Sequence, residues 1–159
     1  MKQNTRTGKV YALQDFSTVL LVSALYKDWS VREAYVREYA RAHRMGLEEE
    51  ARFLEKERAV HSTHREFLVA LYSSNDAWAD LQKKDPVWKV YLYQGEGRFT
   101  PERVEVADPP SALAYKFYDF VTPWTKVYSI KFPPGGGRTL RLVFVSWLGE
   151  VELTWEPKE

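Results

Sequence analysis

The sequence predicts a mainly β protein with α content, namely a seven-stranded immunoglobulin-like β-sandwich with a helical hairpin inserted after its first strand. Three observations lead to this fold class. Hydrophobic residues recur with a period of two over most of the second half of the chain, and the longest stretch with a period of about 3.6 lies between residues 30 and 61. Turn-forming residues separate these segments. The alternative is an α+β fold in which the helices cap an open antiparallel sheet.

One domain accounts for the length of the chain. Its 159 residues are 45% hydrophobic and 15% aromatic, which supplies enough apolar surface for one core. Residues 1–9 are mostly polar and predict a disordered lead-in. We expect residues 10–159 to form a single β-sandwich domain with its helical insertion at residues 30–61.

The first predicted strand covers residues 17–26, STVLLVSALY. Its apolar and β-branched side chains follow one another without helical spacing, which is typical of a strand covered on both faces. The hairpin follows, with Met45 and Gly46 between its two helices. Ser30 is the predicted N-cap of the first helix, and Glu33 would complete a capping box.

Six more strands are predicted after the hairpin. Residues 67–72 are a nearly continuous apolar run, residues 138–147 are also strongly apolar, and the others alternate between apolar and polar side chains. The strands after residue 72 cover residues 87–93, 99–106, 125–132, 138–147 and 150–156. A short helix is expected over residues 111–120. Residues 133–137, PPGGG, predict a flexible connection between strands, because no helix follows them as in a phosphate-binding loop.

The composition excludes several classes of function. Lys and Arg number 23 and Asp and Glu number 22, so the chain has no overall field to attract nucleic acid. The absence of cysteine excludes disulfides and thiolate metal sites. The longest apolar stretch, residues 19–25, is far shorter than the roughly 20 residues of a transmembrane segment. No cofactor is predicted.

Aromatic residues are the most unusual feature, with 6 Trp, 10 Tyr and 8 Phe. Some fall on apolar faces and predict core positions, namely Trp88, Trp155, Phe67, Phe144 and Tyr128. Others fall where loops and outward faces should meet water. The candidate ligand-binding residues among these are Trp78, Tyr115, Tyr118 and Trp124. Exposed aromatic rings suit contacts with a protein or a cell-surface glycan, and the alternative, which is the more common case, is that long loops fold over the sandwich and tuck these rings in.

These rings favour a non-enzymatic binding domain as the main hypothesis, and two alternatives stay open. Glu57, His61 and His64 share a helical face if the second helix runs that far, which would suit a metal-assisted hydrolase. Their spacing differs from that of a zincin motif, and no Gly-x-Ser-x-Gly frame occurs. The second alternative is a structural assembly subunit that associates through its helical hairpin.

Four segments carry a family resemblance: LLVSALYKDWSVREAYVREYAR, FLVALYSSNDAWADL, PVWKVYLY and VTPWTKVYSIKFP. Over residues 10–156, the chain resembles a family of uncharacterised predicted lipoproteins of Gram-negative bacteria. The resemblance implies a cell-envelope location, either periplasmic or anchored to the outer membrane, with the lipid on a removed N-terminal segment. A cytoplasmic location is the alternative. The family implies no activity and no functional residues.

Overall fold

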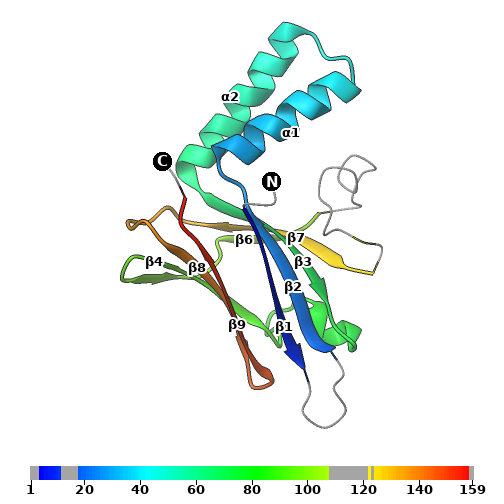
Figure 1. Ribbon diagram of the computed structural model, residues 1–159, viewed down its shortest axis with the longest axis vertical. Coiled ribbons are helices and arrows are strands. Elements are labelled where there is room, and N and C mark those ends of the chain that lie inside the picture. Colours follow the sequence, from blue (N-terminus) through cyan, green and yellow to red (C-terminus); the bar gives the residue numbers. More distant parts are fainter. Residues whose placement is uncertain (1–3, 12–17, 108–121, 123, 158–159) are drawn as a thin grey trace.

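The computed structural model describes residues 4–11, 18–107, 122 and 124–157, and it shows a mainly β fold with two antiparallel sheets and two helices (Figure 1). The five-stranded sheet has the order β1–β2–β3–β7–β6, and the four-stranded sheet has the order β5–β4–β8–β9. The strands are β1 (Thr5–Tyr11), β2 (Thr18–Tyr26), β3 (Arg65–Tyr72), β4 (Lys89–Gln94), β5 (Gly97–Phe99), β6 (Arg103–Val106), β7 (Lys126–Phe132), β8 (Leu140–Ser146) and β9 (Gly149–Trp155). The predicted helix over residues 111–120 lies outside the described residues.

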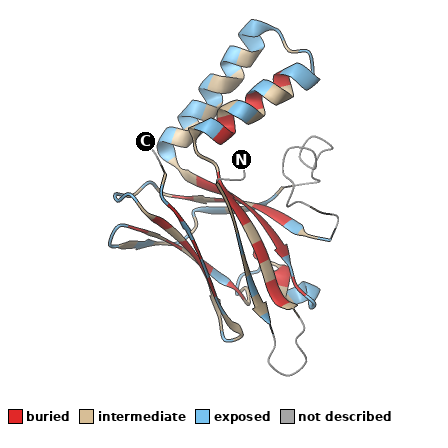
Figure 2. Cartoon of the chain, in the orientation of Figure 1, coloured by how far each residue is buried: buried red, intermediate tan, exposed pale blue. Residues whose placement is uncertain are grey.

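The main core lies between the two sheets. Alternate residues of each central strand point into it, and the five aromatic residues predicted for the core are all buried there. Residues 24–26 of β2 and 66–71 of β3 are buried on both faces, and red marks the buried residues in Figure 2. Leu25 and Leu68 face outward and pack with Val31 at the base of the helices. This second contact explains why both strands have continuous apolar sequences.

The described residues form nine strands instead of the seven predicted, and the first difference is β1. The prediction of a disordered lead-in over residues 1–9 is wrong for Thr5 onward, because these residues pair with β2 along its length. An edge strand satisfies its backbone on one side only, so it needs few apolar side chains. Gly8 has no Cβ, which allows β1 to approach Val151 of β9 closely.

The second difference is that the single strand predicted over residues 99–106 is two strands. β5 belongs to the four-stranded sheet and β6 to the five-stranded sheet, so the chain crosses between the sheets at residues 100–102. Pro101 lies at this crossing, where its missing N–H removes no ladder hydrogen bond. Phe99 lies on one phase of the period-two pattern and Val104 and Val106 lie on the other, so the pattern changes phase at the crossing.

The helical hairpin consists of α1 (Trp29–Ala42) and α2 (Leu47–Thr63), in agreement with the predicted insertion. Asp28 is the N-cap of α1 in place of Ser30, since its Oδ1 accepts hydrogen bonds from the Val31 N–H (3.0 Å) and the Ser30 hydroxyl (2.7 Å). Glu33 pairs instead with Arg37. The mixture of helices and antiparallel sheets agrees with the α+β alternative, but the hairpin extends away from the sheets instead of capping one (Figure 1). No described helix is long and apolar enough to cross a membrane.

A buried network of charged residues attaches the hairpin to the five-stranded sheet. Arg32 is 2% exposed and donates to Glu57 Oε2 of α2 (2.7 Å) and to Glu66 Oε1 of β3 (3.1 Å). The other oxygen of Glu66 accepts from Lys27 Nζ (3.1 Å) and from the Ser129 hydroxyl of β7 (3.1 Å). Both helices and two strands therefore meet at one guanidinium and one carboxylate.

This network makes the stability of the protein sensitive to acid. Burial on its own would raise the pKa of Glu66, but the charges of Lys27 and Arg32 outweigh it and hold that pKa below its usual value of 4.5. A carboxylate with a lowered folded-state pKa stabilises the fold above the unfolded-state value, and this contribution is lost as the pH falls through the folded-state value. We expect the free energy of unfolding, measured by urea titration, to fall as the pH drops below about 4.5.

The matched comparison is Glu66→Gln, which we expect to be less stable at pH 7 and to show a flatter dependence on pH in that acid range. Other carboxylates contribute equally to both proteins, so the difference between the two curves reports Glu66. Parallel curves for the two proteins would contradict this assignment.

Candidate aromatic binding surface

The structure describes two of the four candidate ligand-binding residues. Trp78 and Trp124 are described, whereas Tyr115 and Tyr118 lie outside the described residues. Trp78 lies in η2 (Asp76–Ala79), a short 3₁₀ helix in which the Asn75 side chain accepts from the Ala77 N–H. Its ring is partly buried against the main core. Trp124, in contrast, is 82% exposed.

The backbone around Trp124 is held by hydrogen bonds among its neighbours. The Thr125 hydroxyl donates to the Thr122 carbonyl (2.9 Å) and accepts from the Thr122 N–H (3.1 Å), while the Thr125 N–H donates to the same carbonyl (3.2 Å). Lys126 Nζ then donates to the Asp76 carbonyl (3.1 Å), which ties the start of β7 to η2. The turn therefore keeps the Trp124 ring outward without support from the core.

Trp124 lines a groove of about 450 Å³ on the outer face of β2 and β3. Leu21 and Tyr72 add an aliphatic and an aromatic wall, and Ser23, Thr122 and Thr125 add hydroxyl groups. No charged side chain lines the groove among the described residues. Flat apolar rings beside neutral hydroxyl groups suit a neutral ligand with both apolar and polar faces.

Trp147 is an exposed aromatic residue that the sequence analysis missed. The apolar pattern predicts that Trp147 ends a strand, but β8 ends at Ser146, and Trp147 lies in the two-residue turn between Ser146 and Gly149, where it is 81% exposed. Its ring meets that of Trp78 edge to face, with 6.5 Å between the ring centroids. The Leu148–Gly149 dipeptide was the available signal, since a glycine at the end of an apolar run marks a turn.

The large exposed aromatic side chains of the described residues gather at one end of the sheets. They are Tyr11, Tyr72, Trp124 and Trp147, and we call the part of the surface that they and Trp78 occupy the aromatic end. Strand direction places it opposite the hairpin, because β2 enters and β3 leaves the sheet there, whereas their other ends join the helices. Tyr91 and Tyr93 are not part of it, since they lie on the outer face of β4 beneath Arg98 and Arg141.

The three residues of the predicted metal face do not come together. Glu57 pairs with Arg32, His61 lies beside the ring of Trp29, and His64 Nε2 lies 3.0 Å from Glu102 Oε2. Helix α2 ends at Thr63, so His64 has an extended backbone and leaves the helical face. Within the described ranges, no group of three or more His, Asp or Glu residues is arranged to hold a metal ion.

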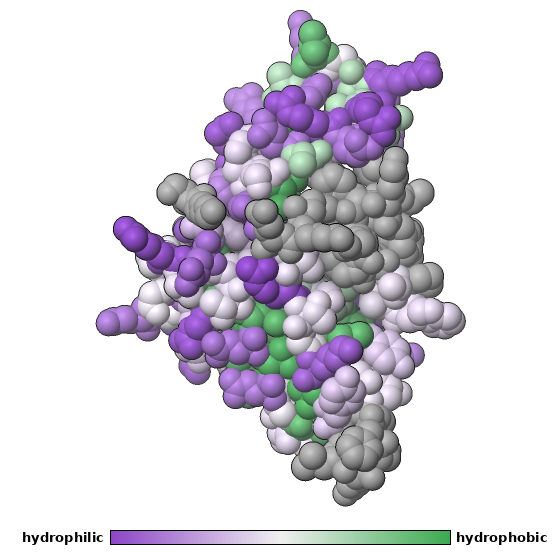
Figure 3. Space-filling view, viewed as in Figure 1, coloured by the Kyte–Doolittle hydropathy of each residue, from purple (hydrophilic) through white to green (hydrophobic). Residues whose placement is uncertain are grey.

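The surface of the hairpin bears on the assembly hypothesis. No residue of α2 is buried, and the hairpin is mostly hydrophilic in the space-filling view (Figure 3). Exposed Arg and Glu side chains pair along it, as in Arg37–Glu33 and Arg41–Glu38. Leu47 is the one large apolar side chain of the two helices that is strongly exposed, at 87%. The hairpin therefore offers little apolar area for self-association.

Comparison of the chain with protein-family models, with curated proteins and with solved structures finds no match.

Proposed function

We propose that this protein is a non-enzymatic binding domain that holds a protein or glycan partner against its aromatic end. The observation that carries the proposal is that three tryptophans from three separate loops lie at the same end of the sheets, two of them with their rings in contact. Trp78 follows β3, Trp124 precedes β7 and Trp147 joins β8 to β9, and two of the three rings are more than four-fifths exposed. Leaving such large apolar rings in water costs free energy that contact with a partner recovers.

The strand order supports an immunoglobulin-like description of the sandwich, as the sequence predicts. If β2 is taken as the first strand, the order β2–β3–β7–β6 corresponds to A–B–E–D of that fold, and β5–β4–β8–β9 corresponds to C′–C–F–G. β1 is then an additional edge strand. The tryptophans fall in the loops equivalent to B–C, D–E and F–G, which share one end of such a sandwich. This comparison is an analogy between folds. It supports the position of the three tryptophans at one end of the sandwich and says nothing about what they bind.

The test compares the unmodified protein with a Trp124→Ala/Trp147→Ala variant in binding assays against peptidoglycan fragments, lipopolysaccharide, arrayed glycans and envelope protein extracts. We expect the variant to lose at least about tenfold in affinity for whichever of these binds, because exposed tryptophans at an interface centre contribute most of the binding energy. Its melting temperature should stay close to that of the unmodified protein, since both rings are exposed.

The matched control is Leu47→Ala at the tip of the hairpin, which removes another exposed apolar side chain and should leave binding unchanged. Undiminished binding by the double tryptophan variant would refute the proposal. A large fall in its melting temperature would also refute it, because the rings would then serve the core.

We further propose a cell-envelope location, on the basis of the resemblance to predicted lipoproteins. Fractionation of cells that express the complete gene tests it, and recovery of the protein with the cytoplasmic fraction would overturn it.

A further inference from the structure

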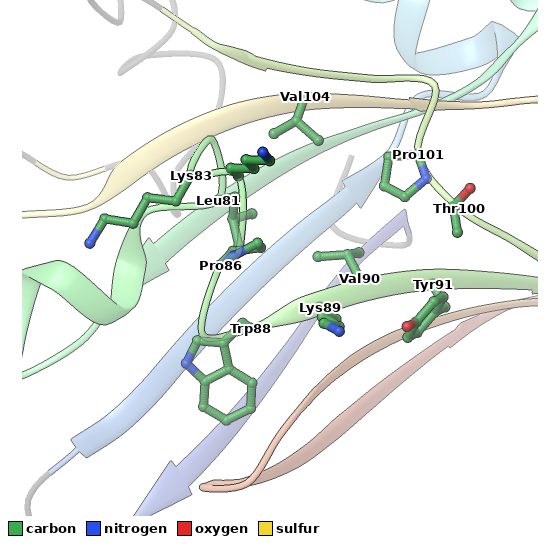
Figure 4. A pocket seen from close by; sticks show the side chains of 11 residues that line it. Leu81, Lys83, Pro86, Trp88, Lys89, Val90, Tyr91, Thr100, Pro101 and Val104 are labelled. Atoms are coloured by element: carbon green, nitrogen blue, oxygen red, sulfur yellow. The ribbon is translucent and has the colours of Figure 1, made fainter.

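A second hollow, of about 360 Å³, opens between the two sheets on the side of β4 and β6, away from the groove of Trp124. β5 ends at Phe99 and pairs with residues 92–94 of β4, so no strand of the described residues pairs with the earlier part of β4 on this side. The chain then crosses at Pro101 to reach β6. Val90 of β4 and Val104 of β6 point toward each other across the opening (Figure 4).

The floor of this hollow is apolar and preformed. Trp88 is fully buried, and Leu81 and Val90 are nearly so. Two hydrogen bonds hold the wall that precedes β4, since the Leu81 N–H donates to the Tyr128 hydroxyl (3.3 Å) and Gln82 Nε2 donates to the Val104 carbonyl (3.3 Å). A ligand that enters would therefore meet an ordered apolar surface instead of having to create one.

The rim of the same hollow is positively charged. Lys83, Lys84 and Lys89 line it and are exposed, and no acidic residue lines it among the described residues. Asp85 is adjacent in sequence but does not line the hollow. None of the ion pairs seen in the described part of the chain uses these three lysines. Three cations around an apolar floor form a local positive field in a chain whose total charge is only +1.

We propose that this hollow binds a small amphipathic anion. The apolar chain or ring of the ligand would lie against Val90, Pro101 and Val104, above the buried Trp88, and its single carboxylate, sulfate or phosphate would pair with the rim lysines. An anion is favoured over a neutral sugar, because three lysines line the hollow, whereas the hydroxyl groups among its described lining residues are those of Tyr91 and Thr100. This inference does not depend on the aromatic end, and either proposal can fail without the other.

The experiment is isothermal titration calorimetry of the full chain with decanoate, decyl phosphate and decyltrimethylammonium, each below its critical micelle concentration. The three probes share one apolar chain, so they separate the need for negative charge from simple apolar binding, and the two anions distinguish the head groups. We expect at least one anion to bind with a Kd below about 1 mM, and the cation to bind at least about tenfold more weakly.

The variant that tests the site is Lys84→Glu/Lys89→Glu, which we expect to weaken binding of the anion at least about tenfold. The control is Lys9→Glu/Lys56→Glu, which changes the net charge equally at exposed positions on β1 and α2 and should leave binding unchanged. The milder Lys84→Gln/Lys89→Gln pair keeps the test valid if reversing both charges disturbs the fold. Binding of neither anion, equal binding of the cation, or equal loss in the control variant would overturn the proposal.

Discussion

Replacing Arg32 with methionine is expected to lower the free energy of unfolding by about 3 kcal/mol or more, which is the range for removing one partner of a buried ion pair. Arg32 is almost fully buried, and Glu66 beside it is 5% exposed. Without the guanidinium, the Glu66 carboxylate keeps its hydrogen bonds from Lys27 and Ser129 but loses its most deeply buried counter-charge, and Glu57 of α2 loses its ion pair with α1. The cost comes chiefly from a buried charge that has lost its compensation.

The matched control is Arg37→Met, on the same helix and with the same change of side chain. Arg37 also contacts two glutamates, Glu33 and Glu50, but its side chain is largely exposed, so water replaces those contacts and we expect little change in stability. Urea unfolding followed by circular dichroism measures both variants. Equal loss in the two would show that burial of the network contributes nothing.

A double-mutant cycle separates the pair from its surroundings. Because Arg32 and Glu66 compensate each other, the loss in Arg32→Met/Glu66→Gln should be smaller than the sum of the two single losses. Strict additivity would mean that the two residues stabilise the fold independently.

Gly137→Ala is expected to lower the free energy of unfolding by about 2–4 kcal/mol, from backbone strain and a steric clash together. The φ of Gly137 is +107°, which side chains other than glycine rarely adopt. A Cβ at this position would lie 2.5 Å from the Gly95 nitrogen and 2.8 Å from its Cα, and backbone atoms of a tight turn have little freedom to move away. The backbone at Gly137 therefore lies so close to the turn between β4 and β5 that only a residue without a Cβ fits there.

The neighbouring Gly136 provides the control, because a Cβ there meets no heavy atom within 4 Å and its φ lies outside the left-handed region. We expect Gly136→Ala to leave the melting temperature unchanged or slightly raised, since alanine reduces the freedom of the unfolded chain. Thermal unfolding of the two variants side by side is the measurement. Similar melting temperatures for both would contradict a requirement for close approach.

The same contacts revise the interpretation of PPGGG as a flexible connection. Gln94, 3% exposed, donates from Nε2 to the Pro133 carbonyl (2.9 Å) and accepts at Oε1 from the Gly135 N–H (2.9 Å). The loop is thus attached to the end of β4 by a buried amide. The glycine content of residues 133–137 indicates conformational freedom when it is considered alone. In the folded protein, the absence of a Cβ at Gly137 lets this loop pack closely against the turn between β4 and β5.

Local pattern was sufficient for the elements whose residues repeat with a clear period. Periodicity predicts β2, β3 and both helices to within a few residues, and alternation predicts the core positions of Trp88 and Trp155. These predictions succeed because the period of a helix or strand is a property of neighbouring residues. The predicted exposure of Trp124 followed similarly, from its place beside a proline in a connection.

Tertiary structure alone decided the features that depend on residues distant in sequence. β1 is a strand because β2 offers it an edge, residues 99–106 divide because the two sheets diverge there, and Trp147 is exposed because β8 turns back at Ser146. Arg32 is buried because β3 brings Glu66 to it, and the lysine-rimmed hollow exists because β5 ends before β4 does. Each of these features results from the pairing of strands that are far apart in the sequence. Such pairing depends on how well all the helices and strands fit together, so no local stretch of sequence specifies it.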